Sequence, residues 1–426
     1  MSALAYLTKL EGNLVKGSDI NFFNIPKCLN NISIYKQPYI KGVDWADLIV
    51  CSSAIKDNTE LQMAKKLGKK VLTRGEWLGV LAKKYQKVIA VAGSHGKTTT
   101  TAMIYNILKV AGKNPTLHLG GNLKGVGNVI SGGKGYFVTE ACEYYDNFLH
   151  LKPYMSVITN IEPEHLDYFK TFENEKKSFE KFKQNSKFVV EKSGYSARNI
   201  YINKDGKIAF NLFKNNQKID RIKLKIGGKY NVKNALYAMT LCEKLGISRD
   251  LIKLGLESFE GVKKRCERVE NNFNFLTFVD YAHHPKEILE SAKYFKKIVR
   301  KKCVAIFQPH TYSRTQKFFD GFLSSLSLFD EIICFKTYSA REREDEGLNE
   351  TDIFNGLLKI GKTAFVCYDI DELKIVLHRY EKQDLVVFLG AGDLPDKFDF
   401  MGNLTWQFFH IIVIFKYEKI FWQSWK

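Results

Sequence analysis

The sequence feature that most constrains the fold is a glycine-rich loop between an apolar strand and an apolar helix. The run Val88–Ala92 predicts a buried strand and leads directly into Gly93-Ser94-His95-Gly96-Lys97-Thr98-Thr99. Apolar residues at helical spacing follow from Met103 to Ala111, and Gly112 ends the pattern. Strand, glycine loop and helix in this order are typical of a nucleotide-binding α/β domain with a parallel sheet.

The residues of this loop have the chemistry needed to bind phosphate. Glycines allow consecutive backbone N–H groups to turn toward one anion, and the start of the following helix adds a positive dipole. Lys97 is expected to reach the β- and γ-phosphates, and the Thr98 hydroxyl to ligate Mg²⁺. The common pattern has a glycine five residues before Gly96, where this chain has Val91, so a shortened loop is predicted. A glycine turn with an incidental Lys-Thr is the alternative, and the strand-loop-helix context disfavours it.

Length and patterning predict a chain of several layered α/β domains. The 426 residues correspond to about three domains at roughly 150 residues each. Short strand-like runs alternate with longer helical stretches, which is typical of mainly parallel sheets. We expect domains at 1–85, 86–262 and 263–398, followed by an unassigned tail at 399–426.

Composition excludes several classes of function. Lys and Arg total 65 against 46 acidic residues, a net charge of +19, but the basic runs are short and scattered. This distribution favours a solvated surface over a nucleic-acid partner. The eight cysteines form no C-x-x-C pair, so we expect reduced thiols and neither a zinc site nor disulfides. The start of the chain does not resemble a signal peptide and no apolar run reaches about 18 residues, so we expect a cytoplasmic protein without membrane insertion.

Two further strand ends in the central region carry candidate metal ligands. They are Glu140-Ala141-Cys142-Glu143 and the stretch from Asn160 to Asp167, which includes His165. A carboxylate near a phosphate loop commonly shares Mg²⁺ with the loop threonine, and a nearby histidine could hold a second ion. Taken alone, a histidine at a strand end is more often a hydrogen-bonded structural residue.

Two loops of the third region follow strands and precede helices. One runs from Asp280 to Pro285 with adjacent His283 and His284, and the other contains His310 and Arg314. Three histidines could suggest zinc, but their spacing matches no closed zinc site. A substrate and nucleotide cleft is favoured, in which Arg314 binds a carboxylate or a phosphate.

Together, these motifs make the chain resemble the Mur ligases over residues 1 to 393. The resemblance rests on eight segments in this order: Gly17-Ser18-Asp19, Ser52-Ser53-Ala54-Ile55, residues 93–101, Glu140-Ala141-Cys142-Glu143-Tyr144, Asn231-Val232-Lys233-Asn234-Ala235, Asp280-Tyr281-Ala282-His283-His284-Pro285, Phe307-Gln308-Pro309-His310 and Gly390-Ala391-Gly392-Asp393.

The resemblance implies an architecture and a reaction. It implies a Rossmann-like UDP-binding domain, a central phosphate-loop ATPase domain and a Rossmann-like C-terminal domain. The implied reaction joins L-alanine to the carboxylate of UDP-N-acetylmuramate through an acyl phosphate, with ATP and two Mg²⁺ ions, in cell-wall synthesis. The implied assembly is a monomer or a weak homodimer. Alternatives are a recycling ligase that adds a tripeptide to the same sugar nucleotide and an inactive remnant that only binds nucleotide.

The resemblance also implies roles for individual residues. Those implied in catalysis are Lys97, His165, His310 and Arg314. Those implied in ATP binding are Gly93, Ser94, His95, Gly96, Lys97, Thr98, Thr99, Asn231, Asn234, Arg265 and Asp280. Those implied in binding the other substrates are Ser53, His95, Tyr281, His283 and Arg314. The implied metal ligands are Thr98, Glu140 and His165.

The chain departs from the family pattern at its start. Family members have a strand and a glycine-rich loop before the segment Met1-Ser2-Ala3-Leu4-Ala5, with which this chain begins. We therefore expect an N-terminal domain without that strand and loop, and a reduced affinity for the UDP-sugar.

Overall fold

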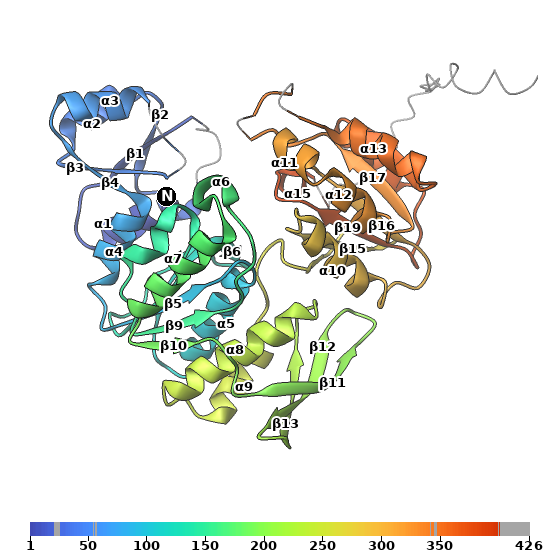
Figure 1. Cartoon of the computed structure of the whole chain (residues 1–426), viewed down its shortest axis with the longest axis horizontal. Coiled ribbons are helices and arrows are strands. Elements are labelled where there is room, and N and C mark those ends of the chain that lie inside the picture. The colour runs from blue at the N-terminus through green and yellow to red at the C-terminus, as the bar shows by residue number, and fades with distance from the viewer. Residues whose placement is uncertain are drawn as a thin grey trace, which may run out of the picture.

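We describe a computed structural model, whose described residues are 1–20, 26–53, 55, 58–340, 342–344, 347–398 and 400. Apart from residue 400, the predicted tail at 399–426 lies outside them. Figure 1 shows three α/β parts, with the N-terminal part in blue, the central part in cyan to yellow and the C-terminal part in orange to red. Among the described residues, no helix is long and apolar enough to cross a membrane.

The N-terminal part contains two separate two-stranded parallel sheets. One pairs β1 with β2, the other pairs β3 with β4, and no described strand joins the two pairs. This differs from the single sheet of a Rossmann-like domain. Its elements are α1 (Ser2–Leu10), β1 (Lys16–Asp19), η1 (Lys27–Leu29), β2 (Ser33–Lys36), α2 (Ile40–Trp45), β3 (Leu48–Cys51), α3 (Thr59–Lys66), β4 (Lys70–Thr73) and α4 (Arg74–Ala82).

The helices α1 and α4 share a hydrophobic core with the central sheet. Leu4 and Leu7 of α1 and Leu81 of α4 are almost fully buried, and they belong to one cluster with Ala90 and Phe137 of the central strands. A capping box between Thr73 and Glu76 fixes the start of α4. The N-terminal part is therefore held to the central part by apolar packing.

The central part is built on a six-stranded sheet in the order β10-β9-β5-β8-β6-β7, in which only β7 is antiparallel to its neighbour. Helices α5, α8 and α9 cover one face, while α1, α4 and α7 contribute to the core on the other. The elements from the sheet to α7 are β5 (Lys87–Ala92), α5 (Lys97–Val110), β6 (Thr116–Leu123), β7 (Gly127–Ile130), β8 (Tyr136–Glu140), η2 (Tyr144–His150), β9 (Met155–Ile158), α6 (Leu166–Phe169) and α7 (Phe172–Gln184).

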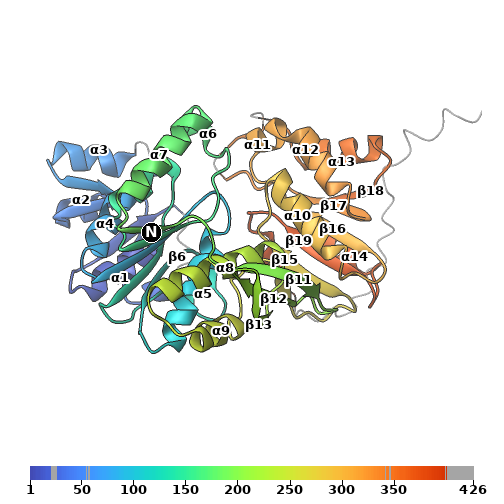
Figure 2. The ribbon, with the colours of Figure 1, turned by 60° about the horizontal axis from the view of Figure 1, so that its bottom comes forward.

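A small antiparallel sheet, β11-β12-β13, extends the central part toward the C-terminal part (Figure 2). The hydroxyl of Tyr294 donates to the Gly206 carbonyl oxygen in the turn between β11 and β12, at 2.5 Å. This bond ties the small sheet to the C-terminal part. The remaining elements of the central part are β10 (Phe188–Val190), β11 (Ser196–Ile202), β12 (Ile208–Lys214), β13 (Gln217–Leu224), α8 (Tyr230–Lys244) and α9 (Arg249–Glu257).

The C-terminal part is a second six-stranded sheet, in the order β14-β15-β19-β16-β17-β18, with only β14 antiparallel. Helices α10, α12 and α13 cover one face, and α14 and α15 cover the other. Its elements are β14 (Glu267–Val269), β15 (Leu276–Asp280), α10 (Pro285–Phe295), β16 (Cys303–Phe307), α11 (Tyr312–Lys317), α12 (Phe319–Leu326), β17 (Glu331–Phe335), α13 (Glu350–Lys359), β18 (Thr363–Cys367), α14 (Ile370–Leu377), β19 (Leu385–Leu389) and α15 (Leu394–Lys397).

The expectation of mainly parallel α/β sheets is confirmed. All eight cysteines are free thiols. Five of them are buried: Cys242, Cys266, Cys303, Cys334 and Cys367.

Candidate functional site

The predicted phosphate loop lies at the carboxyl end of β5, between its neighbours β8 and β9. Gly93 has φ +130°, and a Cβ there would lie 2.1 Å from the Thr159 hydroxyl oxygen. Gly96 has φ +84° at the start of α5, and a Cβ there would lie 2.5 Å from Oδ1 of Asn234. Both positions therefore require glycine for backbone conformation and for space.

The segment that follows β9 holds the loop in place. The Ser94 hydroxyl donates to the Glu162 carbonyl oxygen at 3.1 Å, and the His95 amide donates to Oδ1 of Asn160 at 2.9 Å. The Thr159 hydroxyl donates to the His95 carbonyl oxygen at 2.6 Å. Thr159 and Asn160 thus shape the loop, although no sequence motif singled them out for this role.

Lys97 is almost buried at the first turn of α5. Its ammonium group donates to Oε1 of Glu143 at 2.9 Å, to the Ser94 carbonyl oxygen at 3.0 Å and to the Gly93 carbonyl oxygen. Burial opposes its charge, but the attraction of the Glu143 carboxylate raises the pKa of Lys97 above its ordinary value. Lys97 is therefore a fixed cation, and its neighbour Thr98 is buried on the same turn.

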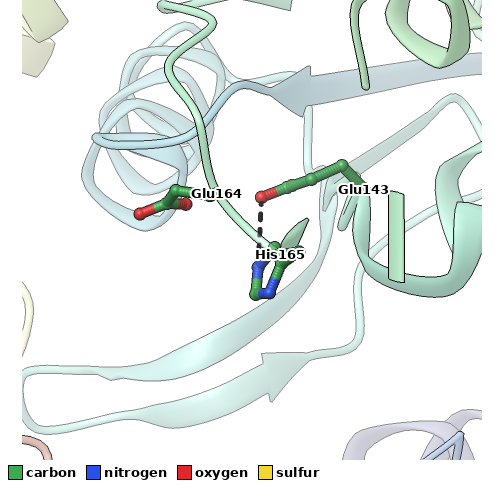
Figure 3. A group of neighbouring side chains, drawn as sticks. All are labelled: Glu143, Glu164 and His165. Carbon is green, nitrogen blue, oxygen red and sulfur yellow. Dashed lines mark ion pairs between the residues drawn. The ribbon is translucent and has the colours of Figure 1, made fainter. Parts of the chain in front are cut away.

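Beside Lys97 lies a group of donors able to bind a metal ion. One ligand atom from each of Glu143, Glu164 and His165 lies within 4.8 Å of the others, and Figure 3 shows the three side chains as neighbours. The distance from His165 Nε2 to Glu143 Oε1 is 3.7 Å. Burial is the main cause of the raised pKa of Glu164.

The donors in this group fit a divalent cation. Carboxylate oxygens suit Mg²⁺ and Mn²⁺, and an imidazole nitrogen is accepted by Mn²⁺. Oε2 of Glu143 is buried and, among the described residues, has no hydrogen-bond partner. The ring of Tyr144 stacks on His165 with centroids 4.3 Å apart, which orients the imidazole.

The predicted metal ligand Glu140 does not join this group in the described structure. Its Oε1 accepts a hydrogen bond from the Gly120 amide at 2.9 Å, on the side of β6. Glu140 ends β8, and the chain turns before Glu143, which brings the second glutamate toward Lys97. Metal binding by Glu140 stays a prediction, while Glu143 and Glu164 are the carboxylates that the structure places beside His165.

The predicted asparagines of α8 lie next to the phosphate loop. Asn234 donates to Oδ1 of Asn231 at 2.9 Å, and Asn231 donates to the Gly227 carbonyl oxygen at 2.6 Å. Both side chains are buried, and Asn234 lies against Gly96. Their contact with adenosine stays a prediction. In the structure, Asn234 packs against Gly96 and Asn231 holds Asn234, so both side chains support the loop.

Ser53 links the N-terminal part to the site region. Its hydroxyl donates to Oδ1 of Asn147 in η2 at 3.2 Å. This places a residue predicted to bind the UDP-sugar next to the segment that carries Glu143 and Tyr144.

The C-terminal part gathers its own predicted residues at the carboxyl ends of β15 and β16. The His283 ring lies 6.0 Å from the His310 ring, and a nitrogen of Arg314 lies 3.2 Å from Nδ1 of His310. The Arg265 guanidinium lies over the Tyr281 ring at 4.6 Å. Burial lowers the pKa of His283 to about 4 and also lowers that of His310, so both imidazoles are neutral at pH 7.

Asp280 is buried at the end of β15 and is bonded within the protein. Its Oδ2 accepts a hydrogen bond from the Ser291 hydroxyl at 2.6 Å, which joins β15 to α10. Burial raises the pKa of Asp280.

The loop and the C-terminal part meet through ion pairs. Nδ1 of His95 lies 3.2 Å from Glu287 of α10 and 3.7 Å from Glu164, and Lys286 lies 3.0 Å from Glu162. Burial lowers the pKa of His95, but the carboxylates of Glu287 and Glu164 outweigh it and raise the pKa above its ordinary value. These ion pairs bring the phosphate loop and the segment after β9 against the start of α10 in the C-terminal part.

Glu287 is the main residue of this contact that sequence motifs missed. Its only local signal is its place in the first turn of a helix that begins at Pro285, because the dipole of a helix favours acidic residues near its N-terminus. That signal explains a helix start and gives no indication of a partner 192 positions earlier in the chain.

Comparisons with known proteins identify the family. Residues 91–192 match the model of the Mur ligase middle domain, and residues 264–392 match that of the Mur ligase, glutamate ligase domain. A UDP-N-acetylmuramate--L-alanine ligase of Caldicellulosiruptor saccharolyticus is 39% identical over 433 residues, covering 92% of this chain and 94% of the relative. The chain belongs to the Mur ligase family.

Further relatives of this Mur ligase agree with that assignment. An enzyme of the same name from Caldanaerobacter subterraneus is 37% identical and covers 92% of this chain and 93% of the relative. The crystal structure of UDP-N-acetylmuramate-alanine ligase MurC from Thermotoga maritima superimposes with a TM-score of 0.79 at 28% identity, covering 93% of this chain and 94% of that one. The three-part α/β architecture predicted from the sequence is thus confirmed as the Mur ligase fold.

Proposed function

We propose that this Mur ligase joins L-alanine to the carboxylate of UDP-N-acetylmuramate in an ATP-dependent reaction. The observation that carries the proposal is the contact between the phosphate loop, with its cation Lys97, and the C-terminal part: His95 of the loop pairs with Glu287, which also lies 3.4 Å from His283. The relatives at 37% and 39% identity bear the name of this reaction.

The central part and the C-terminal part have distinct tasks in the proposed reaction. Lys97 and the loop amides bind the ATP phosphates, while Thr98, His165 and the neighbouring carboxylates would hold Mg²⁺. When bound, Mg²⁺ neutralises charge on the phosphates. Arg314 orients the muramate carboxylate or its phosphate as a bidentate donor.

The chemistry needs positioning and charge neutralisation more than a protein nucleophile. A carboxylate oxygen of the muramate attacks the γ-phosphorus, and the bond to the ADP leaving oxygen breaks. The alanine amine then attacks the acyl carbon, inorganic phosphate leaves, and the amide remains. Neutral His283 and His310 keep additional positive charge away from the incoming amine. Because ATP and a UDP-sugar are cytosolic compounds, we place this reaction in the cytoplasm.

Phosphate release and product mass test the proposal. The chain is incubated with ATP, Mg²⁺ and UDP-N-acetylmuramate, with either L-alanine or an L-alanyl tripeptide as the acceptor. We expect alanine-dependent phosphate release and a product whose mass corresponds to one added alanine. Preference for the tripeptide would assign the recycling reaction instead, and ATP binding without any amide would leave only the inactive remnant.

A further inference from the structure

The ammonium group of Lys97 has all three of its N–H donors engaged within the protein. Its acceptors are the carbonyl oxygens of Gly93 and Ser94 and Oε1 of Glu143. An ammonium group has three donors and no more, so a phosphate oxygen gains a bond from Lys97 only if one of these acceptors gives way. Glu143 is the acceptor of interest, because it is the only charged one of the three.

Release of Lys97 leaves Glu143 in an unfavourable position. Its side chain is 0% exposed, and its Oε2 has no partner among the described residues. Its other described neighbour at ion-pair distance is His165, at 3.7 Å. A buried carboxylate that loses its cation pays a large desolvation cost, so Lys97 leaves Glu143 readily only if another cation replaces it.

The surroundings of Glu143 allow such a replacement. Donor atoms of Glu164 and His165 lie within 4.8 Å of its carboxylate (Figure 3). These are ligands for a divalent cation, which would pair with the carboxylates more strongly than a monovalent ammonium group.

We propose that Glu143 couples nucleotide binding to divalent-cation binding in this Mur ligase. Glu143 competes with phosphate for Lys97, and a cation that pairs with Glu143 frees Lys97 for the phosphate. This inference takes from the proposed function only that the loop binds an adenine nucleotide. It adds a role for Glu143, which is not among the metal or phosphate ligands that the family resemblance implies.

The first test is the affinity for ADP, measured calorimetrically with and without Mg²⁺, for the wild type and Glu143→Gln. Loss of the competing charge should tighten Mg²⁺-free ADP binding about tenfold, the size expected for one charge-assisted hydrogen bond. The increase in ADP affinity that Mg²⁺ produces should therefore be smaller in Glu143→Gln than in the wild type. Glu162→Gln is the matched control, because it removes the same charge from the neighbouring loop but its partner is Lys286. Unchanged Mg²⁺-free affinity in Glu143→Gln would overturn the proposal.

The second test removes the internal cation and uses Mn²⁺ alone as the probe. Lys97→Met should bind Mn²⁺ more tightly than the wild type in the absence of nucleotide, measured by electron paramagnetic resonance of free Mn²⁺. A gain of about tenfold is expected for the loss of one competing charge. Equal or weaker Mn²⁺ binding in a Lys97→Met variant whose circular dichroism spectrum matches that of the wild type would overturn the coupling. Neither test involves L-alanine or a tripeptide. A failure of the proposed alanine reaction would therefore not affect either result, and the two proposals can be refuted independently.

Discussion

The stability of this Mur ligase should depend on pH through Glu175, which occupies the buried face of α7 with Ser178, Phe179 and Phe182. Its Oε2 accepts the Glu164 amide at 3.1 Å, and its buried Oε1 has no partner among the described residues. Burial raises the pKa of Glu175 from 4.5 to about 7. The folded state therefore binds more protons than the unfolded state between these two values, and the free energy of unfolding falls as pH rises through them.

The contribution of Glu175 to this pH dependence can be isolated with Glu175→Gln, which keeps a hydrogen-bond acceptor for the Glu164 amide and removes the charge. Raising a pKa from 4.5 to about 7 corresponds to about 3 kcal/mol. The variant should therefore be more stable than the wild type by about 3 kcal/mol near pH 8, and about equal to it below pH 5. For a domain of this size the gain is a rise of roughly 6 to 12 °C in melting temperature.

Calorimetric melting across this pH range is the assay. Glu180→Gln, on the exposed face of the same helix, is the control, and its melting temperature should differ from the wild type by a small and constant amount. A difference between Glu175→Gln and the wild type that is the same at both ends of the range would refute the reasoning, because it would show that Glu175 does not titrate there.

Three further predictions concern the loop, a helix contact and the contact between the two parts. Lys97→Ala should abolish phosphate release and leave the circular dichroism spectrum unchanged, because Lys97 bonds within a ligand loop; an active variant would contradict the loop assignment. Gly255→Ala should lower the free energy of unfolding by about 1 to 3 kcal/mol, since a Cβ there would lie 2.6 Å from a backbone atom of α5, while Gly135→Ala, with open space around it, should cost less than about 0.5 kcal/mol. Equal denaturation midpoints for the two would argue against tight packing. Glu287→Gln should lower the pKa of His95, followed by the NMR shift of its imidazole protons, because the Glu287 carboxylate favours the charged ring; an unmoved titration would exclude the ion pair.

Local patterns predicted the frame of the fold. The strand before the loop and the helix after it were expected from the apolar run and the glycines, and they form as Lys87–Ala92 and Lys97–Val110. Short apolar runs such as Glu331–Phe335 and Leu385–Leu389 form strands, as the alternation of strand-like and helical stretches predicts. These elements are buried on both faces, so their composition alone indicates them.

The partners in the site were less predictable, because they are set by three-dimensional contacts. Glu140 ends β8 and Glu143 follows it by three residues, and only the turn after β8 decides which of them reaches Lys97. The pairing of His95 with Glu287 requires two parts of the chain to approach each other. The antiparallel sheet β11–β13 was likewise not predicted, because the short alternation of buried and partly buried residues in a strand such as Ile208–Lys214 is a weak signal in sequence.

The core that α1 and α4 share with the central sheet has a consequence for synthesis on the ribosome. These two helices are made first, but Ala90 and Phe137, against which Leu4 and Leu81 pack, are added later. At about 5 to 20 residues per second, the helices wait for several seconds before the strand that carries Phe137 emerges. During that time their apolar faces are open to chaperones and to other nascent chains, so the first 82 residues complete their folding only when the second part is present.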